Sequence, residues 1–244
     1  MEPLTKSITF HSEIPAACRS GDAGQDRYPP CILGVDEAGR GPVLGNLDPK
    51  QLAYAKGALL SPTTIARPIN PPVKPIDSLL GPMVYAACYC LEERYEEMQK
   101  LGFADSKTLD PSQREKLFEI INSPDNREHI GWGVTVLSPQ DISRGMLKTD
   151  KYNLNALAHD TTIKLLQSIL SRGIRVTKVF IDTVGPPAAY QHKLQSIFPN
   201  IEITVSKKAD SLYPIVSAAS ICAKVPRDAI LDHWIFEESG IQHA

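Results

Sequence analysis

The chain has 244 residues, of which 42% are hydrophobic and 22% are charged, which is the balance of a globular protein rather than a disordered one. Its 26 Lys and Arg residues and 28 Asp and Glu residues give a net charge of −2. This excludes a uniformly cationic surface, so nucleic-acid binding would need a local basic patch. No apolar run reaches the roughly 18 residues that a membrane span needs, which argues against a membrane partner. The five cysteines are irregularly spaced, without a CxxC pair, and are expected to be reduced thiols of an intracellular protein.

The regular pattern begins after residue 30. Residues 1–30 are polar and without a clear period, so they are predicted to be a flexible leader with little role in the fold. Strands are predicted over 31–36, 81–90, 129–139, 175–182 and 201–206, and helices over 92–100, 111–121, 153–171, 188–198 and 210–238. Asp110 and Pro111 suit the start of the helix at 111–121. Strands that alternate with amphipathic helices predict an α/β fold with a sheet of mixed direction.

One segment, residues 46–80, interrupts this pattern. It contains six prolines, at positions 49, 62, 68, 71, 72 and 75. Because proline lacks an amide hydrogen, the stretch PINPPVKP is excluded from a central strand and from a helix interior. A structureless loop of this length is uncommon inside a compact domain. The segment is therefore expected to be either a surface excursion or an insertion foreign to the fold.

Acidic residues end two of the predicted strands, at Asp36 and Asp182. If these strands are parallel neighbours, their carboxylates meet at one edge of the sheet, where open α/β sheets usually carry their sites. Glu37 follows directly, and it shares a site with Asp36 only if the strand ends or bends there, since neighbouring side chains point to opposite faces. The Gly39–Pro42 segment favours such a bend. Asp210 follows the last predicted strand closely.

Four converging carboxylates would repel one another unless cations neutralised them. Oxygen-only ligation suits hard divalent ions such as Mg²⁺ or Mn²⁺. Two such ions can bind a phosphodiester, activate water and stabilise the leaving oxygen. The acids are therefore compatible with a metal site, and the alternative reading of the same residues is that strand-end aspartates cap helices or form surface ion pairs.

The surroundings of Asp210 are basic. Between residues 205 and 227 the chain has four cations, at Lys207, Lys208, Lys224 and Arg227, and one acid. Lys107 lies in a second polar turn. Each cation alone is typical of a solvated surface, but together they indicate contacts with phosphates that position a backbone without reading its sequence. His159 lies inside a predicted helix and is expected to be structural.

Five stretches of the sequence together closely resemble the type 2 ribonuclease H family, in its eukaryotic three-subunit form. They are GVDEAGRGPVLG (34–45), ADSKTL (104–109), KYNLNALAHDTTI (151–163), VFIDTVGPP (179–187) and KKADSLYPIVSAASICAKVPRD (207–228). The resemblance implies a ribonuclease H-like α/β fold over residues 31–244, with a mixed five-stranded sheet flanked by helices. It implies an endonuclease that hydrolyses the RNA strand of RNA–DNA hybrids and cuts at ribonucleotides embedded in DNA, leaving 3′-hydroxyl and 5′-phosphate ends.

The resemblance also assigns roles to single residues. The acids that it marks as catalytic and as ligands of two Mg²⁺ or Mn²⁺ ions are Asp36, Glu37, Asp182 and Asp210. The residues that it places on the substrate are Gly39, Arg40, Gly41, Ser106, Lys107, Lys207 and Arg227. The implied partners are an RNA–DNA hybrid duplex and two accessory subunits, and the implied location is the nucleus. The backbone of a tight glycine loop is suited to hydrogen-bond the 2′-hydroxyl, the group that distinguishes RNA from DNA.

The sequence departs from the family pattern in two places. The family runs from the equivalent of Gly45 directly to that of Pro82, whereas here residues 46–80 intervene, as a retained intron or a lineage insertion. The chain also stops at Ala244, before a helical region that in the family carries a substrate-contacting tyrosine and surface for the accessory subunits. The alternatives to an active enzyme are therefore an inactive truncated form that folds poorly or only binds nucleic acid, or a different two-metal phosphodiesterase. The DEAGRG and KAD motifs argue against the latter.

Overall fold

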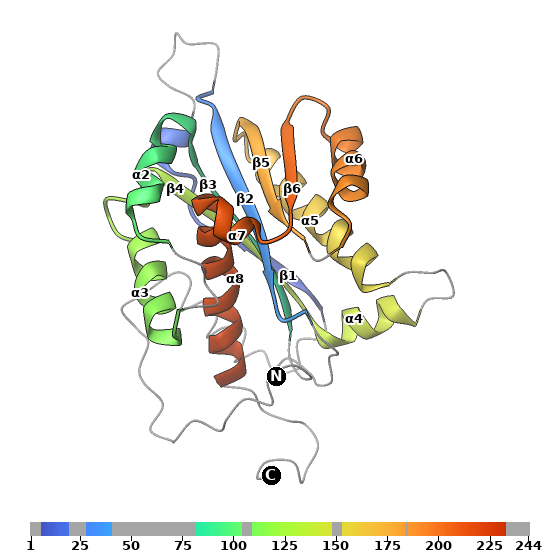
Figure 1. The fold of residues 1–244 in the computed structure, drawn as a ribbon. Helices are drawn as coiled ribbons and strands as arrows, with labels where there is room; N and C mark the ends of the chain where they lie inside the picture. Colours follow the sequence, from blue (N-terminus) through green and yellow to red (C-terminus); the bar gives the residue numbers. More distant parts are fainter. Residues whose placement is uncertain are drawn as a thin grey trace.

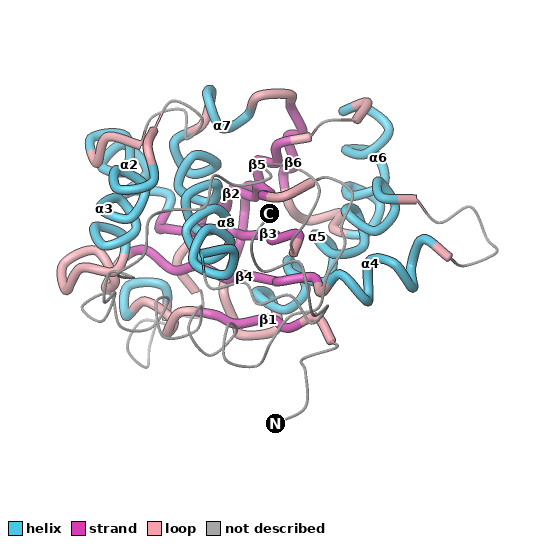
Figure 2. The backbone as a smooth tube through the Cα atoms, turned by 90° about the horizontal axis from the view of Figure 1, so that it is seen from below, coloured by secondary structure: helices cyan, strands magenta, loops and turns pink. Residues whose placement is uncertain are grey.

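The computed structural model describes residues 6–19, 28–40, 82–103, 109–147, 153–183 and 185–232. These residues form a six-stranded sheet that lies between two layers of helices (Figures 1 and 2). The strand order is β1-β4-β3-β2-β5-β6. The proline-rich segment 46–80 and the predicted substrate residues Gly41, Ser106 and Lys107 lie outside the described residues.

The sheet is mixed, as the sequence predicts. Its strands are β1 (Ile8–His11), β2 (Cys31–Ala38), β3 (Met83–Leu91), β4 (Ile130–Leu137), β5 (Val176–Asp182) and β6 (Glu202–Ser206). β2, β3 and β4 pair antiparallel in chain order, and β1 pairs antiparallel with β4. β5 runs parallel to both β2 and β6. The carboxyl ends of β2, β5 and β6 therefore lie at the same edge of the sheet.

The helices cover both faces of the sheet. They are α2 (Tyr95–Lys100), α3 (Pro111–Ile121), α4 (Pro139–Met146), α5 (Leu154–Leu170), α6 (Pro187–Ile197), α7 (Ala209–Leu212) and α8 (Pro214–Asp232), with 3₁₀ turns η1 (Ala16–Cys18) and η3 (Glu92–Arg94). Asp110 caps α3 as predicted, because its side chain accepts from the Gln113 amide at 2.8 Å. Helix α4 is an addition to the predicted set. The predicted helix at 210–238 is divided into α7 and α8, and its residues 233–238 lie outside the described residues. None of the described helices is both long and apolar enough to cross a bilayer.

Two hydrophobic cores follow from the alternation of the central strands. Ile32 faces the layer that contains α2, α3 and α8, whereas Leu33 and Val35 face the layer that contains α4, α5 and α6 (Figure 2). Gly34 lets α8 approach β2 closely, because a β-carbon there would lie 2.6 Å from the amide nitrogen of Val216. Helix α8 therefore lies against the strand that ends in the acidic pair.

The sixth strand corrects two predictions, the five-stranded sheet and the leader without a role in the fold. β1 lies within residues 1–30 and forms an edge of the sheet beside β4. Its end is fixed to α5, since His11 Nε2 lies 2.6 Å from Ser168 Oγ. Just beyond α5, Arg172 donates to the carbonyl of Ser12 at 2.8 Å. The segment is too short to give a strong periodic signal, and its partner β4 lies more than a hundred residues away.

We expect the contact of His11 to weaken in acid. Burial, followed by the charge of Arg172, lowers the pKa of His11 from 6.5 to about 4. The unfolded chain therefore takes up a proton before the folded protein does, and stability is lost as the pH falls from about 6.5 towards 4. Because the side chain is only half-buried, the expected loss is about 1 kcal/mol. Urea unfolding measures the free energy of unfolding of His11→Gln relative to that of the natural chain. This difference should shift by about 1 kcal/mol in favour of the variant between pH 7 and pH 5. A difference that does not change with pH would contradict the assignment.

Candidate functional site

Asp36 and Asp182 lie side by side where β2 and β5 end. Val35 is registered opposite Ile181 in the parallel pair, and each is followed by one of these acids. Val35 and Ile181 both belong to the core on the α5 side, so Asp36 and Asp182 point to the α8 side. The register thus brings together two carboxylates that are 146 positions apart in the sequence.

Asp36 is almost fully buried beneath α8. Its Oδ1 accepts from the backbone amide of Glu37 at 2.7 Å, and the Ser220 hydroxyl also hydrogen-bonds its carboxylate. Lys224, one turn further along α8, donates to Ser220 Oγ at 2.7 Å. Burial raises the pKa of Asp36 from 3.8 to about 7; the Ser220 hydrogen bond opposes this shift and the charge of Asp182 adds to it. Because Asp182 lies beside the buried Asp36, a positive charge at this point would stabilise the two carboxylates.

Glu37 points to the opposite face of the sheet. It is registered across from Tyr85 in β3, and its Oε1 accepts from Arg40 Nη1 at 2.9 Å. Burial raises its pKa, against the effect of Arg40. The bend that the glycines predict comes at Gly39, with φ 81°, directly after β2 ends at Ala38. The two acids nevertheless border one cleft, because they are at the end of the sheet.

Asp210 is held close to Asp182 by the chain reversal after β6. Lys208 adopts a left-handed conformation with φ 56°, and the next amide, that of Ala209, donates to Asp182 Oδ1 at 2.8 Å. Asp210 follows in the first turn of α7, and it is only 3% exposed. The four predicted acids therefore gather at the same edge of the sheet, although Asp210 does not line the cleft.

The cleft has a volume of about 320 Å³, and both signs of charge border it. Its lining residues are Asp36, Glu37, Ala38, Gly39, Arg40, Arg114, Asp182, Lys224, Arg227 and Asp228. Gly39 brings the strand end close to α8, because a β-carbon there would meet the Arg227 side chain and lie 2.6 Å from the Pro82 carbonyl oxygen. Three of the predicted substrate residues, Gly39, Arg40 and Arg227, border this space, whereas Lys207 is exposed at the end of β6 and does not.

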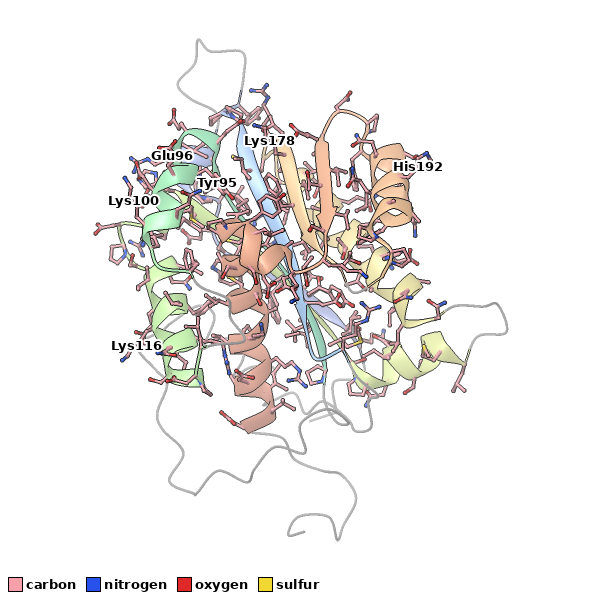
Figure 3. All side chains as sticks on the ribbon, viewed as in Figure 1. Tyr95, Glu96, Lys100, Lys116, Lys178 and His192 are labelled. Atoms are coloured by element: carbon pink, nitrogen blue, oxygen red, sulfur yellow. The ribbon has the colours of Figure 1, made fainter. Side chains whose placement is uncertain are left out.

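A smaller cavity adjoins the acids on the α5 side, and it contains residues that sequence reasoning missed. Tyr85, Asn155, Thr162 and Tyr190 line it together with Glu37 and Arg40. His159 also lines it, with its ring stacked on Tyr190 at a centroid distance of 3.6 Å. By contrast, His192 lies on the exposed surface of α6 (Figure 3). The strand register of β3 is the only signal that could have identified Tyr85.

The donor chemistry of this edge fits a hard divalent cation, because the acids offer only oxygen atoms as ligands. As they stand, the acids rest on protein donors: Asp36 on Ser220, Glu37 on Arg40, and Asp182 on the Ala209 amide. Among the described residues, no group of three or more Asp, Glu, His or Cys side chains is arranged so that it could hold a metal ion. Ligation would therefore require at least one carboxylate to exchange a protein donor for the ion.

The chain is similar to known proteins of one family. The family model for ribonuclease HII matches residues 77–240. The A subunit of ribonuclease H2 from Homo sapiens is 46% identical over 234 residues, which cover 96% of this chain and 62% of that protein. The same subunit from Schizosaccharomyces pombe is 44% identical over 230 residues, which cover 93% and 57%. The chain thus spans about three fifths of the length of these relatives.

A solved structure shows the same fold. The ribonuclease H2 from Pyrococcus horikoshii OT3 matches with a TM-score of 0.57 and 27% identity, over 83% of this chain and 74% of that chain. The similarity therefore extends from the sequence to the arrangement of the sheet and helices. The chain belongs to the ribonuclease HII family.

Proposed function

We propose that this chain is a metal-dependent endonuclease that hydrolyses the RNA strand of RNA–DNA hybrids and cuts at ribonucleotides embedded in DNA. The observation that carries the proposal is the pairing of Asp36 and Asp182 at the ends of two parallel strands, beside a cleft that also presents Arg40, Lys224 and Arg227. The carboxylates are suited to bind a divalent metal ion, and the basic side chains around them are suited to bind a phosphate backbone. The same cleft can therefore hold both the metal ion and the nucleic acid. Family membership supports this assignment.

The residues that would hold the metal are the four acids Asp36, Glu37, Asp182 and Asp210. Mg²⁺ and Mn²⁺ both fit the oxygen-only donor set, and two ions are proposed with substrate. Bound there, the ions would supply neutralising charge and a more acidic water for attack on phosphorus, with 3′-hydroxyl and 5′-phosphate products.

The chain's own cations would bind and orient the nucleic acid. Arg40, Lys224 and Arg227 border the acids, so a phosphate that they hold lies next to the carboxylate pair. The turn at Gly39 exposes backbone at the cleft, where an amide can meet a ribose 2′-hydroxyl. We propose further substrate contacts, on motif alone, for the residues Gly41, Ser106, Lys107 and Lys207.

Partners and location are proposed from the relatives. Their names describe one subunit of ribonuclease H2. We therefore propose that the chain joins accessory subunits and works in the nucleus. Co-purification of tagged full-length chain from its own cells tests the assembly, and recovery of the chain as a monomer would count against it.

The direct test is cleavage of a labelled DNA duplex that contains one ribonucleotide, with Mg²⁺ or with Mn²⁺. We expect one cut beside the ribonucleotide, with 3′-hydroxyl and 5′-phosphate ends, and no cut in a matched all-DNA duplex. Equal cleavage of both duplexes would favour a different phosphodiesterase. A cooperatively melting protein that binds the duplex and cuts with neither ion would favour the form that only binds nucleic acid.

A further inference from the structure

We propose that Asn155, in the first turn of α5, is a positioning residue that holds Arg40 at the cleft and thereby strengthens binding of the ribonucleotide-containing strand. The proposal deepens the proposed nuclease function and rests on it, because Arg40 is one of the cations assigned to the substrate. Asn155 itself is assigned no contact with the reacting atoms.

The evidence begins with the two hydrogen bonds of the Arg40 guanidinium. Its Nη1 donates to Glu37 Oε1 at 2.9 Å, and its Nη2 donates to Asn155 Oδ1. Asn155 is 115 positions away in the sequence and belongs to another layer of the fold, so this contact joins the end of β2 to the start of α5. Arg40 lines both the cleft and the smaller cavity, which places its guanidinium between the two faces of the sheet edge.

The helix start does not require Asn155. Asn153 is the N-cap of α5, since its Oδ1 accepts from the amide of Ala156 at 3.0 Å. Asn155 is the second helical residue and is exposed, and asparagine has a lower helix propensity than alanine. Its side chain is directed to Arg40 instead, which gives it a role that helix formation does not explain.

A neutral anchor suits this position because the other anchor of Arg40 has a competing role. Glu37 is one of the proposed metal ligands, and a carboxylate that turns to a cation loosens its bond to Arg40. The amide oxygen of Asn155 would keep Arg40 in place without adding negative charge beside the phosphates. The guanidinium has five N–H donors, so two bonds do not exhaust its capacity to bind a phosphate.

The test compares Asn155→Ala with the natural chain on the duplex that contains one ribonucleotide. We expect KM to rise about tenfold and kcat to stay within about twofold, because a binding contact is weakened and the metal-binding acids are untouched. Asn155→Gln, which keeps an amide oxygen on a longer side chain, should restore most of the affinity. Gln167→Ala, an exposed change on the same helix, is the matched control and should leave both constants unchanged.

A double-mutant cycle separates positioning from a direct or structural role. Arg40→Ala should weaken binding, and adding Asn155→Ala should then cost little more, since both changes remove the same arrangement. Fluorescence anisotropy of the hybrid in EDTA measures this without cleavage. Independent, additive losses, or an Asn155→Ala variant that binds like the natural chain, would overturn the proposal. Binding that depends on Asn155 without any cleavage by the natural chain would overturn only the proposed function, and absence of both binding and cleavage would overturn both.

Discussion

Replacing Asp36 by asparagine is expected to reduce cleavage by about a thousandfold or more while making the metal-free protein more stable. The loss of activity follows from removing a charge that the proposed metal site needs. The gain in stability follows because burial and the neighbouring Asp182 raise the pKa of Asp36 to about 7. Above that pH the folded protein carries a buried charge that the unfolded chain accommodates more easily, and asparagine removes this cost.

The pH window of this effect is fixed by the direction of the shift. Because the folded pKa lies above the ordinary value of 3.8, the natural chain loses stability as the pH rises from about 4 to about 7. The advantage of Asp36→Asn should therefore be small at pH 4.5 and about 4 kcal/mol at pH 8. Urea unfolding in EDTA at the two pH values measures it.

A matched aspartate outside the site provides the control for Asp36→Asn. Asp141 in α4 accepts from the Ser7 amide at 2.6 Å and from the Ser7 hydroxyl at 2.7 Å. Asp141→Asn should weaken these bonds, lower stability and leave cleavage intact. If Asp36→Asn melted at a lower temperature than the natural chain in EDTA at pH 8, or still cleaved, the assignment of Asp36 as a buried, charged metal ligand would fail.

Replacing Gly34 by alanine is expected to destabilise the protein by about 3 kcal/mol, a large part of the stability of a typical domain. The β-carbon would lie 2.6 Å from the amide nitrogen of Val216 and would also meet the carbonyl of Ile215. These are backbone atoms of α8, so the clash is relieved only by moving the helix away from β2. Since α8 also carries Ser220, Lys224 and Arg227, the same movement should weaken the site.

Chemical denaturation of Gly34→Ala beside Gly185→Ala tests this contact. A β-carbon at Gly185 would meet nothing nearer than Thr183 Oγ1 at 3.9 Å, so that variant should unfold close to the natural chain. Near-equal unfolding free energies for the two variants would show that the backbones of β2 and α8 are not in close contact at Gly34.

The parts of the fold that could be predicted are those written in local patterns. The apolar runs at 31–36 and 175–182 are long enough to indicate buried strands, and each ends in an acid, so the pairing of Asp36 with Asp182 needed only the assumption of parallel neighbours. The cap at Asp110 is likewise a local signal. For these elements, residues that are close together in the sequence determine the local structure.

The remaining features depend on contacts that local patterns do not contain. β1 is a four-residue edge strand, held by β4 and by the side chains of Ser168 and Arg172. The apolar pattern that predicts a strand over 129–139 continues to Pro139, and helix α4 begins at that same residue. Pairing with β3 keeps β2 extended to Ala38, so Glu37 points to the opposite face from Asp36. Asn155 reaches Arg40 only once α5 has packed on the sheet.

The most direct test of the acidic edge as a metal site is anomalous diffraction from crystals grown with Mn²⁺ and a hybrid that resists cleavage. We predict a manganese peak in contact with the carboxylates of Asp36 and Asp182, next to a substrate phosphate. Bound hybrid without manganese between these two side chains, or manganese bound at another place on the protein, would contradict the proposal.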